Sequence, residues 1–152
     1  MITLTQTNSE KTVNLGNVSC ITLEAEKNKV IFNFMNPINK FGRDTPDYAY
    51  FVYDGPEEAI NAYATIKEIA YIKQNFLFST YAGNKTVVNK NSINTISERE
   101  TQLNLIFNLN FSVTNENNHN ISKSVFWTYP DEDSFEADRL LVDAAIESRY
   151  II

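Results

Sequence analysis

The stretch NSEKTVNLGN, residues 8–17, has a partial counterpart in GNKTVVNKN, residues 83–91, and both contain Lys-Thr-Val. A shift of 74 residues superimposes the two tripeptides, and it extends the match over most of the chain if one residue is inserted at each of two places. The matched apolar and aromatic pairs include Ile2 with Phe76, Leu4 with Phe78, Phe32 with Phe107, and Tyr53 with Tyr129. The pattern predicts an internal duplication with a boundary near residue 74.

Each half is expected to form four strands. The first strand covers residues 2–7, the second covers about 12–24, and the fourth covers 48–53, with a counterpart at 124–129. The third strand is clearest in the second half, where apolar side chains alternate with mostly amide side chains over residues 103–111. This period of two is typical of a strand with one face buried and the other exposed.

A helix is expected after each fourth strand. Asp54-Gly55-Pro56-Glu57-Glu58 offers a cap, a proline suited to the first turn and acids that the helix dipole favours, and Pro130–Asp133 opens the second helix similarly. The sequence therefore predicts an α+β fold of two tandem ββββα repeats, with antiparallel sheets packed against helices. We expect one domain, residues 1–152, made of pseudo-symmetric repeats 1–74 and 75–152.

Charge and composition restrict the class of protein. The net charge is −6, and all of the excess acid lies in residues 56–73 and 130–152, so the strands and loops together are neutral. Cys20 is the single cysteine, no apolar run approaches the length of a membrane span, and the first residues lack the basic start of a signal peptide. We expect an intracellular, cytoplasmic protein without membrane contact, in the host cytoplasm if a phage encodes it.

No motif for catalysis is evident. The four glycines form no nucleotide-binding loop, and the single histidine, His119, lies in a polar loop where a solvated side chain is the simpler interpretation. Asp131, Glu132 and Asp133 could suggest a metal site, but acids at a helix start explain them more simply. We therefore expect a protein that is not an enzyme and that carries no cofactor or metal.

The alternation of residues also predicts what the outer face of each sheet carries. Agreement between the two halves puts Phe32, Phe51, Phe107 and Trp127 in the core, which leaves amides and isolated aromatic rings outside. Such rings can stack on the bases of a single strand while lysines contact its phosphates. The same rings could instead be buried against a second sheet or in an oligomer contact.

A family resemblance points in the same direction. The segment VNLGNVSCITLEAEKNKVIFNF, residues 13–34, followed by another strand and a helix, resembles the PC4 transcription-coactivator fold, and two such units in one chain resemble the whirly proteins, which bind single-stranded DNA. Lys27-Asn28-Lys29-Val30 stands where the Lys-Gly-Lys-type turn of these families would fall. Asn28 replaces the glycine, and Glu100-Thr101-Gln102-Leu103 in the second half lacks the lysines. The resemblance thus implies that the first half supplies more of the phosphate contacts.

The leading hypothesis is a protein that binds single-stranded DNA without base specificity, with RNA as the alternative strand. The predicted binding residues are Lys27, Lys29, Asn33, Lys40, Arg43, Tyr48, Tyr50, Asn104, Asn108, Lys123 and Phe126. The alternative hypothesis is a structural or interaction module of a phage particle or another assembly, which would use the same face as a protein interface. Under either hypothesis we expect further partners to be copies of the chain itself or another protein.

Overall fold

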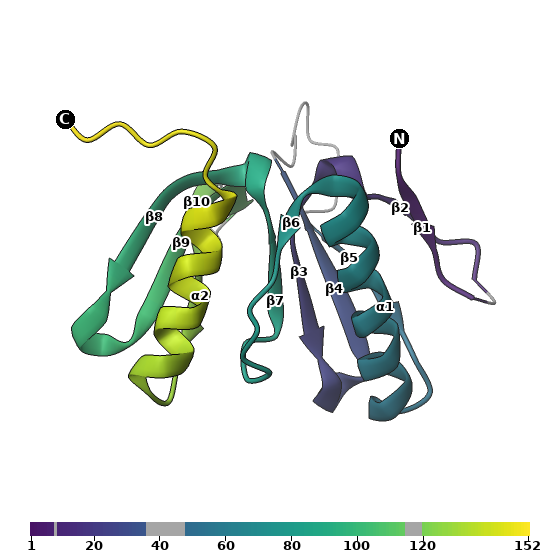
Figure 1. The fold of residues 1–152 in the computed structure, drawn as a ribbon. Coiled ribbons are helices and arrows are strands. Elements are labelled where there is room, and N and C mark those ends of the chain that lie inside the picture. Colours follow the sequence, from purple (N-terminus) through teal and green to yellow (C-terminus); the bar gives the residue numbers. More distant parts are fainter. Residues whose placement is uncertain (8, 36–47, 115–119) are drawn as a thin grey trace.

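The computed structural model describes residues 1–7, 9–35, 48–114 and 120–152, except for the side chains of 110–114 and 120–123 (Figure 1). Strands and a helix follow one another in the same order twice. The first series is β1 (Thr3–Thr5), β2 (Thr12–Asn14), β3 (Val18–Glu24), β4 (Lys29–Phe34), β5 (Tyr48–Val52) and α1 (Pro56–Gln74). The second series is β6 (Phe76–Leu77), β7 (Thr86–Asn89), β8 (Ile93–Arg99), β9 (Asn104–Thr114), β10 (Asn120–Thr128) and α2 (Glu132–Ala145).

Each series has five strands where four were expected, because the second extended stretch is interrupted. A 3-10 turn at Leu15–Asn17 separates β2 from β3, and the side chain of Asn14 caps it by accepting a hydrogen bond from Gly16 N at 3.0 Å. Asn89 caps the corresponding turn before β8 by accepting from Asn91 N at 2.9 Å. The α+β class with antiparallel sheets and two helices is confirmed. The expected number of strands was wrong, because this turn divides the second strand of each series into two.

The sheets do not follow the division into halves. A five-stranded sheet has the order β5-β4-β3-β7-β6, a three-stranded sheet has the order β10-β9-β8, and β1 pairs with β2. Every pairing among these described strands is antiparallel. The hairpin of β6 and β7 therefore belongs to the second series in sequence but completes the sheet of the first series.

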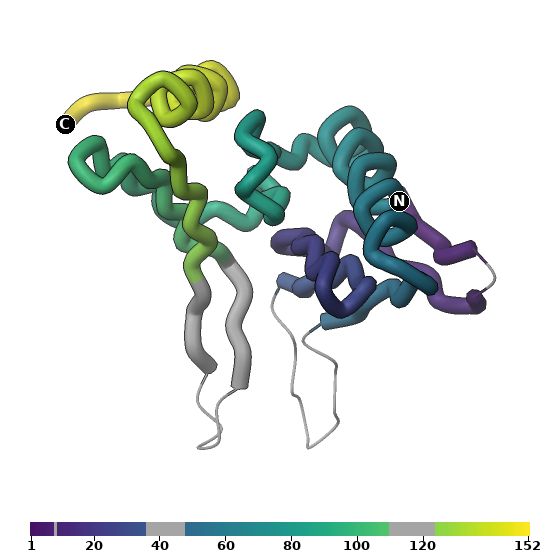
Figure 2. The backbone as a smooth tube through the Cα atoms, turned by 90° about the horizontal axis from the view of Figure 1, so that it is seen from below, coloured from purple at the N-terminus to yellow at the C-terminus, as the bar shows by residue number. Residues whose placement is uncertain are grey.

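Both helices lie on the same side of the molecule and leave the opposite sheet faces uncovered by helix (Figure 2). Under α1, the rings of Phe32 and Phe51 form an edge-to-face pair with centroids 4.8 Å apart, and both side chains are buried. In the second series, Phe107 and Trp127 repeat this contact at 4.6 Å. The positions predicted to face the core on strands three and four do so.

Each helix begins with the residues expected from the sequence, except that α1 has no side-chain cap. Asp131 caps α2 by accepting from Ser134 N at 2.8 Å. In α1 the capping position is Gly55, which makes no side-chain cap, and Asp54 lies outside the helix. Proline at the first helical position lacks an N–H, so one of the groups that a cap would satisfy is absent there. Neither described helix has an apolar stretch long enough to cross a membrane.

The second helix is attached to the hairpin loop by a buried carboxylate. Asp138 is only 1% exposed, and it accepts hydrogen bonds from Thr80 N at 3.0 Å, from Tyr129 OH at 2.7 Å and from the hydroxyls of Ser79 and Thr80. Burial, followed by the hydrogen bond to Asp138, raises the pKa of Tyr129. A buried charge is stable only with such partners, so the contact holds α2 in one place.

Replacing Asp138 with alanine should lower the free energy of unfolding by about 3 kcal/mol, because several buried donors lose their acceptor at once. Urea denaturation followed by circular dichroism measures the change. Asp143→Ala is the matched control, since Asp143 contacts Arg139 and Arg149 at the partly exposed surface of the same helix and should cost less than about 1 kcal/mol. Equal midpoints for the two variants would show that the buried contact does not anchor α2.

Candidate nucleic-acid interface

The candidate interface is the outer face of β4 and β5, opposite α1. The register of the two strands sets Ile31 opposite Tyr50 and Asn33 opposite Tyr48. These side chains alternate with core residues such as Phe32 and Phe51, so the period of two brings them together on the uncovered face. Tyr48 is 52% exposed, so its ring is accessible from this face.

Tyr50 holds two lysines over its ring. The Nζ atom of Lys29 lies 4.4 Å from the ring centroid, and that of Lys11 lies 4.6 Å from it. Lys11 also donates from Nζ to the carbonyl oxygen of Tyr50 at 2.8 Å. Cations within about 6 Å of a ring centroid are attracted by the negative face of the ring, so Tyr50 concentrates positive charge at one point of the sheet.

Tyr48 extends this cluster with a second ring. Its centroid lies 6.1 Å from that of Tyr50, with an angle of 26° between the ring planes. The lysines occupy positions over Tyr50, so Tyr48 is the ring that is available for stacking. We call Lys11, Lys29, Tyr48 and Tyr50 the lysine–tyrosine cluster. Lys11 was missed from the sequence, because only the packing of the β1–β2 hairpin beside β5 brings it near Tyr50.

The turn before β4 contributes less charge than the sequence indicated. Lys27 lies 3.4 Å from the carboxylate of Glu24, and its side chain is 68% exposed. Glu24 also pairs across the strands with Lys29. A nearby carboxylate offsets part of the charge that a phosphate would meet, so Lys27, which forms the ion pair, is a weaker candidate than Lys11. Lys29, which lies opposite Glu24, is affected to a lesser extent. Asn28 adopts the left-handed conformation of the turn, with φ of 56°, which asparagine tolerates well.

Part of the first sheet's outer face is covered by the second series. Cys20 is 2% exposed and packs in the second core cluster, together with Val88 and Leu109. Asn33 donates from Nδ2 toward the Cys20 sulfur at 3.5 Å, at the border of this covered region. The accessible face is therefore limited to β4, β5 and the adjoining hairpin.

The outer face of the second sheet carries an isolated ring. Phe126 is 56% exposed and lies between Ser124 and Thr128 on β10. Asn108 pairs with Ser124 across the strands, whereas the side-chain oxygen of Asn104 is buried without a hydrogen bond from any described residue. That oxygen cannot contact a ligand in this conformation. The described residues do not include Lys40, Arg43 and His119 or the side chain of Lys123. Of these, Lys40, Arg43 and Lys123 were predicted binding residues.

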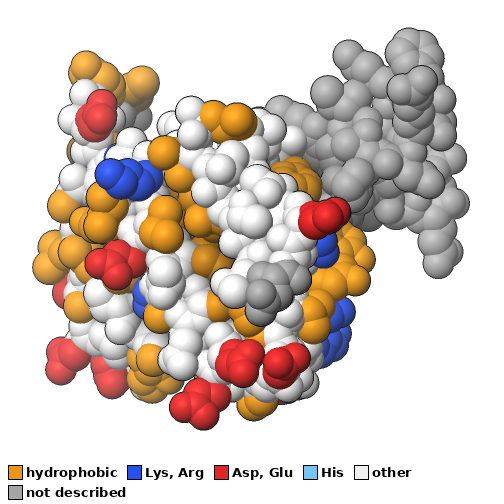
Figure 3. All heavy atoms as spheres, turned by 90° about the vertical axis from the view of Figure 1, so that its right-hand side faces the viewer, with side chains coloured by type: hydrophobic (Ala, Val, Ile, Leu, Met, Phe, Trp, Pro, Cys, Tyr) orange, Lys and Arg blue, Asp and Glu red, His pale blue; other side chains and the backbone are white. Residues whose placement is uncertain are grey.

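Most of the excess acid lies on the helices, although Glu24 lies opposite Lys29 of the lysine–tyrosine cluster and Glu10 precedes Lys11. On α2, Arg139 pairs with Glu136 and Asp143, and Arg149 pairs with Asp143. In Figure 3, which shows the side of the molecule with α1 and the β1–β2 hairpin, acids gather toward the end where α1 begins with Glu57 and Glu58. The net negative charge is therefore mainly a property of the helices. Within the part of the chain that the structure describes, no three His, Cys, Asp or Glu side chains come together as metal ligands.

Comparison with known proteins gives no family for this chain. No protein-family model matches it, and no curated protein matches its sequence. One solved structure, the LytTr DNA-binding domain of a putative methyl-accepting/DNA response regulator from Bacillus cereus, is similar over 93% of this chain and 94% of its own, with 14% identity and a TM-score of 0.44. A likeness of this size establishes neither a shared fold nor a shared ligand. The resemblance to PC4 and whirly proteins stays a prediction.

The geometry of the cluster predicts an NMR signature. The protons next to the ammonium groups of Lys11 and Lys29 should resonate upfield of those of Lys73, an exposed lysine on α1, because the Tyr50 ring shields them. In a Tyr50→Leu variant both shifts should move to the position of Lys73. Unchanged lysine resonances in that variant would mean that the two ammonium groups do not lie over Tyr50 in solution.

Proposed function

We propose that this protein binds single-stranded DNA without base specificity, through the outer face of β4 and β5. The observation that carries the proposal is the lysine–tyrosine cluster, in which two ammonium groups are held over one ring beside an exposed second ring. Two like charges held close together are a favourable site for an anion such as a phosphate. The role is one of binding, and it involves no catalytic step.

In this proposal the lysines and the tyrosines of the cluster have different roles. Lys11 and Lys29 contact successive phosphates, and Tyr50 fixes their positions. Tyr48 stacks on a base, which contributes about 1–3 kcal/mol for a ring of this kind. Because every base has a flat face, stacking of this type does not select a sequence. Asn33 and Lys27 lie at the edges of the face and contribute weaker contacts, and Phe126 on the second sheet offers a further ring.

The distribution of charge supports a modest affinity. The protein has a net charge of −6, so attraction over long distances is absent, and binding depends on the local lysines. Each phosphate contact with a single strand contributes a salt dependence of about 0.7 in the slope of log affinity against log salt. A site with two principal cations is therefore expected to bind well only at low ionic strength.

Fluorescence polarisation with a labelled oligo-dT tests the proposal. The unaltered protein should bind at low salt, and Lys11→Glu/Lys29→Glu should lower the affinity roughly tenfold or more and flatten the salt slope by about 1.4. Lys67→Glu/Lys73→Glu on α1 is the control with the same change of charge, and it should bind nearly as well as the parent. If both double variants lose affinity equally, net charge rather than the cluster governs binding.

The stacking ring is tested in the same assay. Tyr48→Ala should weaken binding by about 5-fold to 150-fold, the equivalent of one lost stacking contact, whereas Tyr150→Ala in the exposed C-terminal segment should not. An oligo-rU of the same length shows whether RNA binds as well as DNA. Absence of binding to both strands at low salt would refute the proposal and leave a protein interface as the use of this face.

A further inference from the structure

We propose that this protein assembles head to tail, with β2 of one copy pairing with β8 of the next copy. The pairing would reproduce the one that β7 makes with β3 inside a single chain. The partner is thus a second copy of this protein, and the inference does not depend on any nucleic-acid ligand.

The first step is that the two series correspond position by position. The 3-10 turns before β4 and β9 end at Asn28 and Leu103, which are 75 residues apart. Both residues have a left-handed φ, of 56° and 50°. Asn14 and Asn89, also 75 apart, cap the turns before β3 and β8. This spacing makes β8 the counterpart of β3, and β2 the counterpart of β7. It corrects the shift of 74 predicted for this region: Thr12 and Val13 correspond to Val87 and Val88, so the two Lys-Thr-Val stretches are out of register by one residue.

The second step is the pairing between β3 and β7. Ile21 lies opposite Val87, Thr22 opposite Thr86, and the two threonine hydroxyls are 3.0 Å apart. Side-chain bonds add to the ladder, since Asn89 Nδ2 donates to the carbonyl oxygen of Val18 at 2.8 Å. With β4 on one side and β7 on the other, the first half of β3 is almost completely buried.

The third step is that the counterparts of these strands are not joined to each other. Among the described strands, β8 pairs with β9 alone and β2 pairs with β1 alone. Most of the β8 side chains are exposed. The two strands lie at opposite ends of the molecule (Figure 1), so one chain cannot bring them together. Two copies can, and the arrangement leaves the same two strands free at the ends of the pair.

The backbone of both strands presents groups for a ladder. Gln6 N donates to the carbonyl oxygen of Lys11 at 3.3 Å, which makes Thr5 and Thr12 a non-hydrogen-bonded pair. The N–H and C=O of Thr12 therefore point away from β1. On β8, Glu98 is the counterpart of Leu23, whose N–H donates to the carbonyl oxygen of Lys85 at 2.9 Å. The N–H of Glu98 is expected to point outward in the same way.

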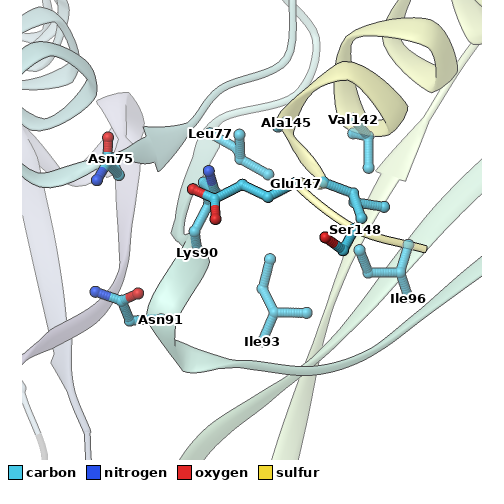
Figure 4. A pocket seen from close by; sticks show the side chains of 11 residues that line it. Asn75, Leu77, Lys90, Asn91, Ile93, Ile96, Val142, Ala145, Glu147 and Ser148 are labelled. Carbon is cyan, nitrogen blue, oxygen red and sulfur yellow. The ribbon is translucent and has the colours of Figure 1, made fainter. Parts of the chain in front are cut away.

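A cavity of about 520 Å³ beside β8 supports the same assignment (Figure 4). Ile93, Ile96 and Val142 line it, and their counterparts in the first series are Val18, Ile21 and Ile66, which are buried in the first core cluster. In that cluster Phe76 and Val87, both from the β6–β7 hairpin, are also completely buried. On its β8 side the cavity thus adjoins the edge where the hairpin of a following unit would be received. Its other sides are lined by Asn75 and Leu77 of the same chain and by residues 145–148.

The correspondence defines a register. Val13 of one copy would lie opposite Thr95 of the other, Thr12 opposite Ile96, and Lys11 opposite Ser97. Thr3 and Phe76 are the cross-strand partners of Asn14 and Asn89, so Thr3, and not Ile2 as predicted, takes the place of Phe76. The incoming hairpin thus carries Thr3 and Thr12 in place of Phe76 and Val87, and backbone hydrogen bonds rather than apolar burial dominate the contact. We expect weak, reversible association. Because the two surfaces differ, the contact is heterologous and extends to rings or filaments instead of stopping at a symmetric dimer.

Sedimentation velocity of the full chain across a wide range of concentrations tests the proposal. The average mass should rise with concentration for the unaltered protein. Glu98→Pro and Thr12→Pro each remove an outward N–H on one of the two surfaces, and each variant alone should stay at the monomer mass of 17.4 kDa. An equimolar mixture should form a one-to-one dimer and nothing larger, since each variant keeps one intact surface.

Two substitutions at one exposed position provide a test that does not disturb the strands. Ser97→Lys places a positive charge opposite Lys11 of the partner, and Ser97→Glu places a negative charge there. The dissociation constant of the lysine variant should exceed that of the glutamate variant roughly threefold to tenfold at low salt. A monomer at every concentration, a proline variant that still self-associates, or equal constants for the two Ser97 variants would overturn the proposal.

Discussion

The structure depends on the antiparallel pairing of β3 with β7. This pairing brings a hairpin from the second series into the sheet of the first, so that the two series cannot be separated without leaving backbone groups of β3 unpaired. It also buries Phe76 and Val87 under α1 and Cys20 against the second core cluster. A single strand pairing thus determines the packing of both cores and the part of the outer sheet face that stays accessible.

The residues on the accessible face are those of the part of the sheet that this pairing leaves uncovered. Near β3 the second series covers the sheet, whereas at the far edge the β1–β2 hairpin contacts β5 through Gln6 and Lys11. There the hairpin places Lys11 over Tyr50, next to Lys29, and Tyr48 remains exposed beside them. The net negative charge comes mainly from the helices, on the other side of the sheets, while Glu24 lies opposite Lys29 in the cluster. A protein with a net negative charge can therefore present a small positive site.

Several features followed from the sequence because they depend on local periodicity. Alternation of apolar and amide residues correctly separated core from outer positions, as Phe32, Phe107 and Trp127 demonstrate. The 3-10 turn after Asn14 was not predicted, since it depends on one side-chain cap within an otherwise extended stretch. Lys11 was not predicted as a binding residue, and Lys27 was predicted to contribute more charge than it does, for the same reason. Whether a lysine is available depends on its neighbours in space, and Glu24 and Tyr50 become neighbours only in the fold.

The sequence by itself determined the α+β class, the faces that the third and fourth strands bury and the helix that follows each group of strands, because these properties need only a repeating pattern and a few turn residues. Tertiary structure alone decided that β7 joins β3, that β8 and β2 are left at opposite ends, and that two lysines meet over one ring. These contacts connect residues that are far apart in the chain. Their stability comes from ladder hydrogen bonds and buried area, which no local pattern of residues records.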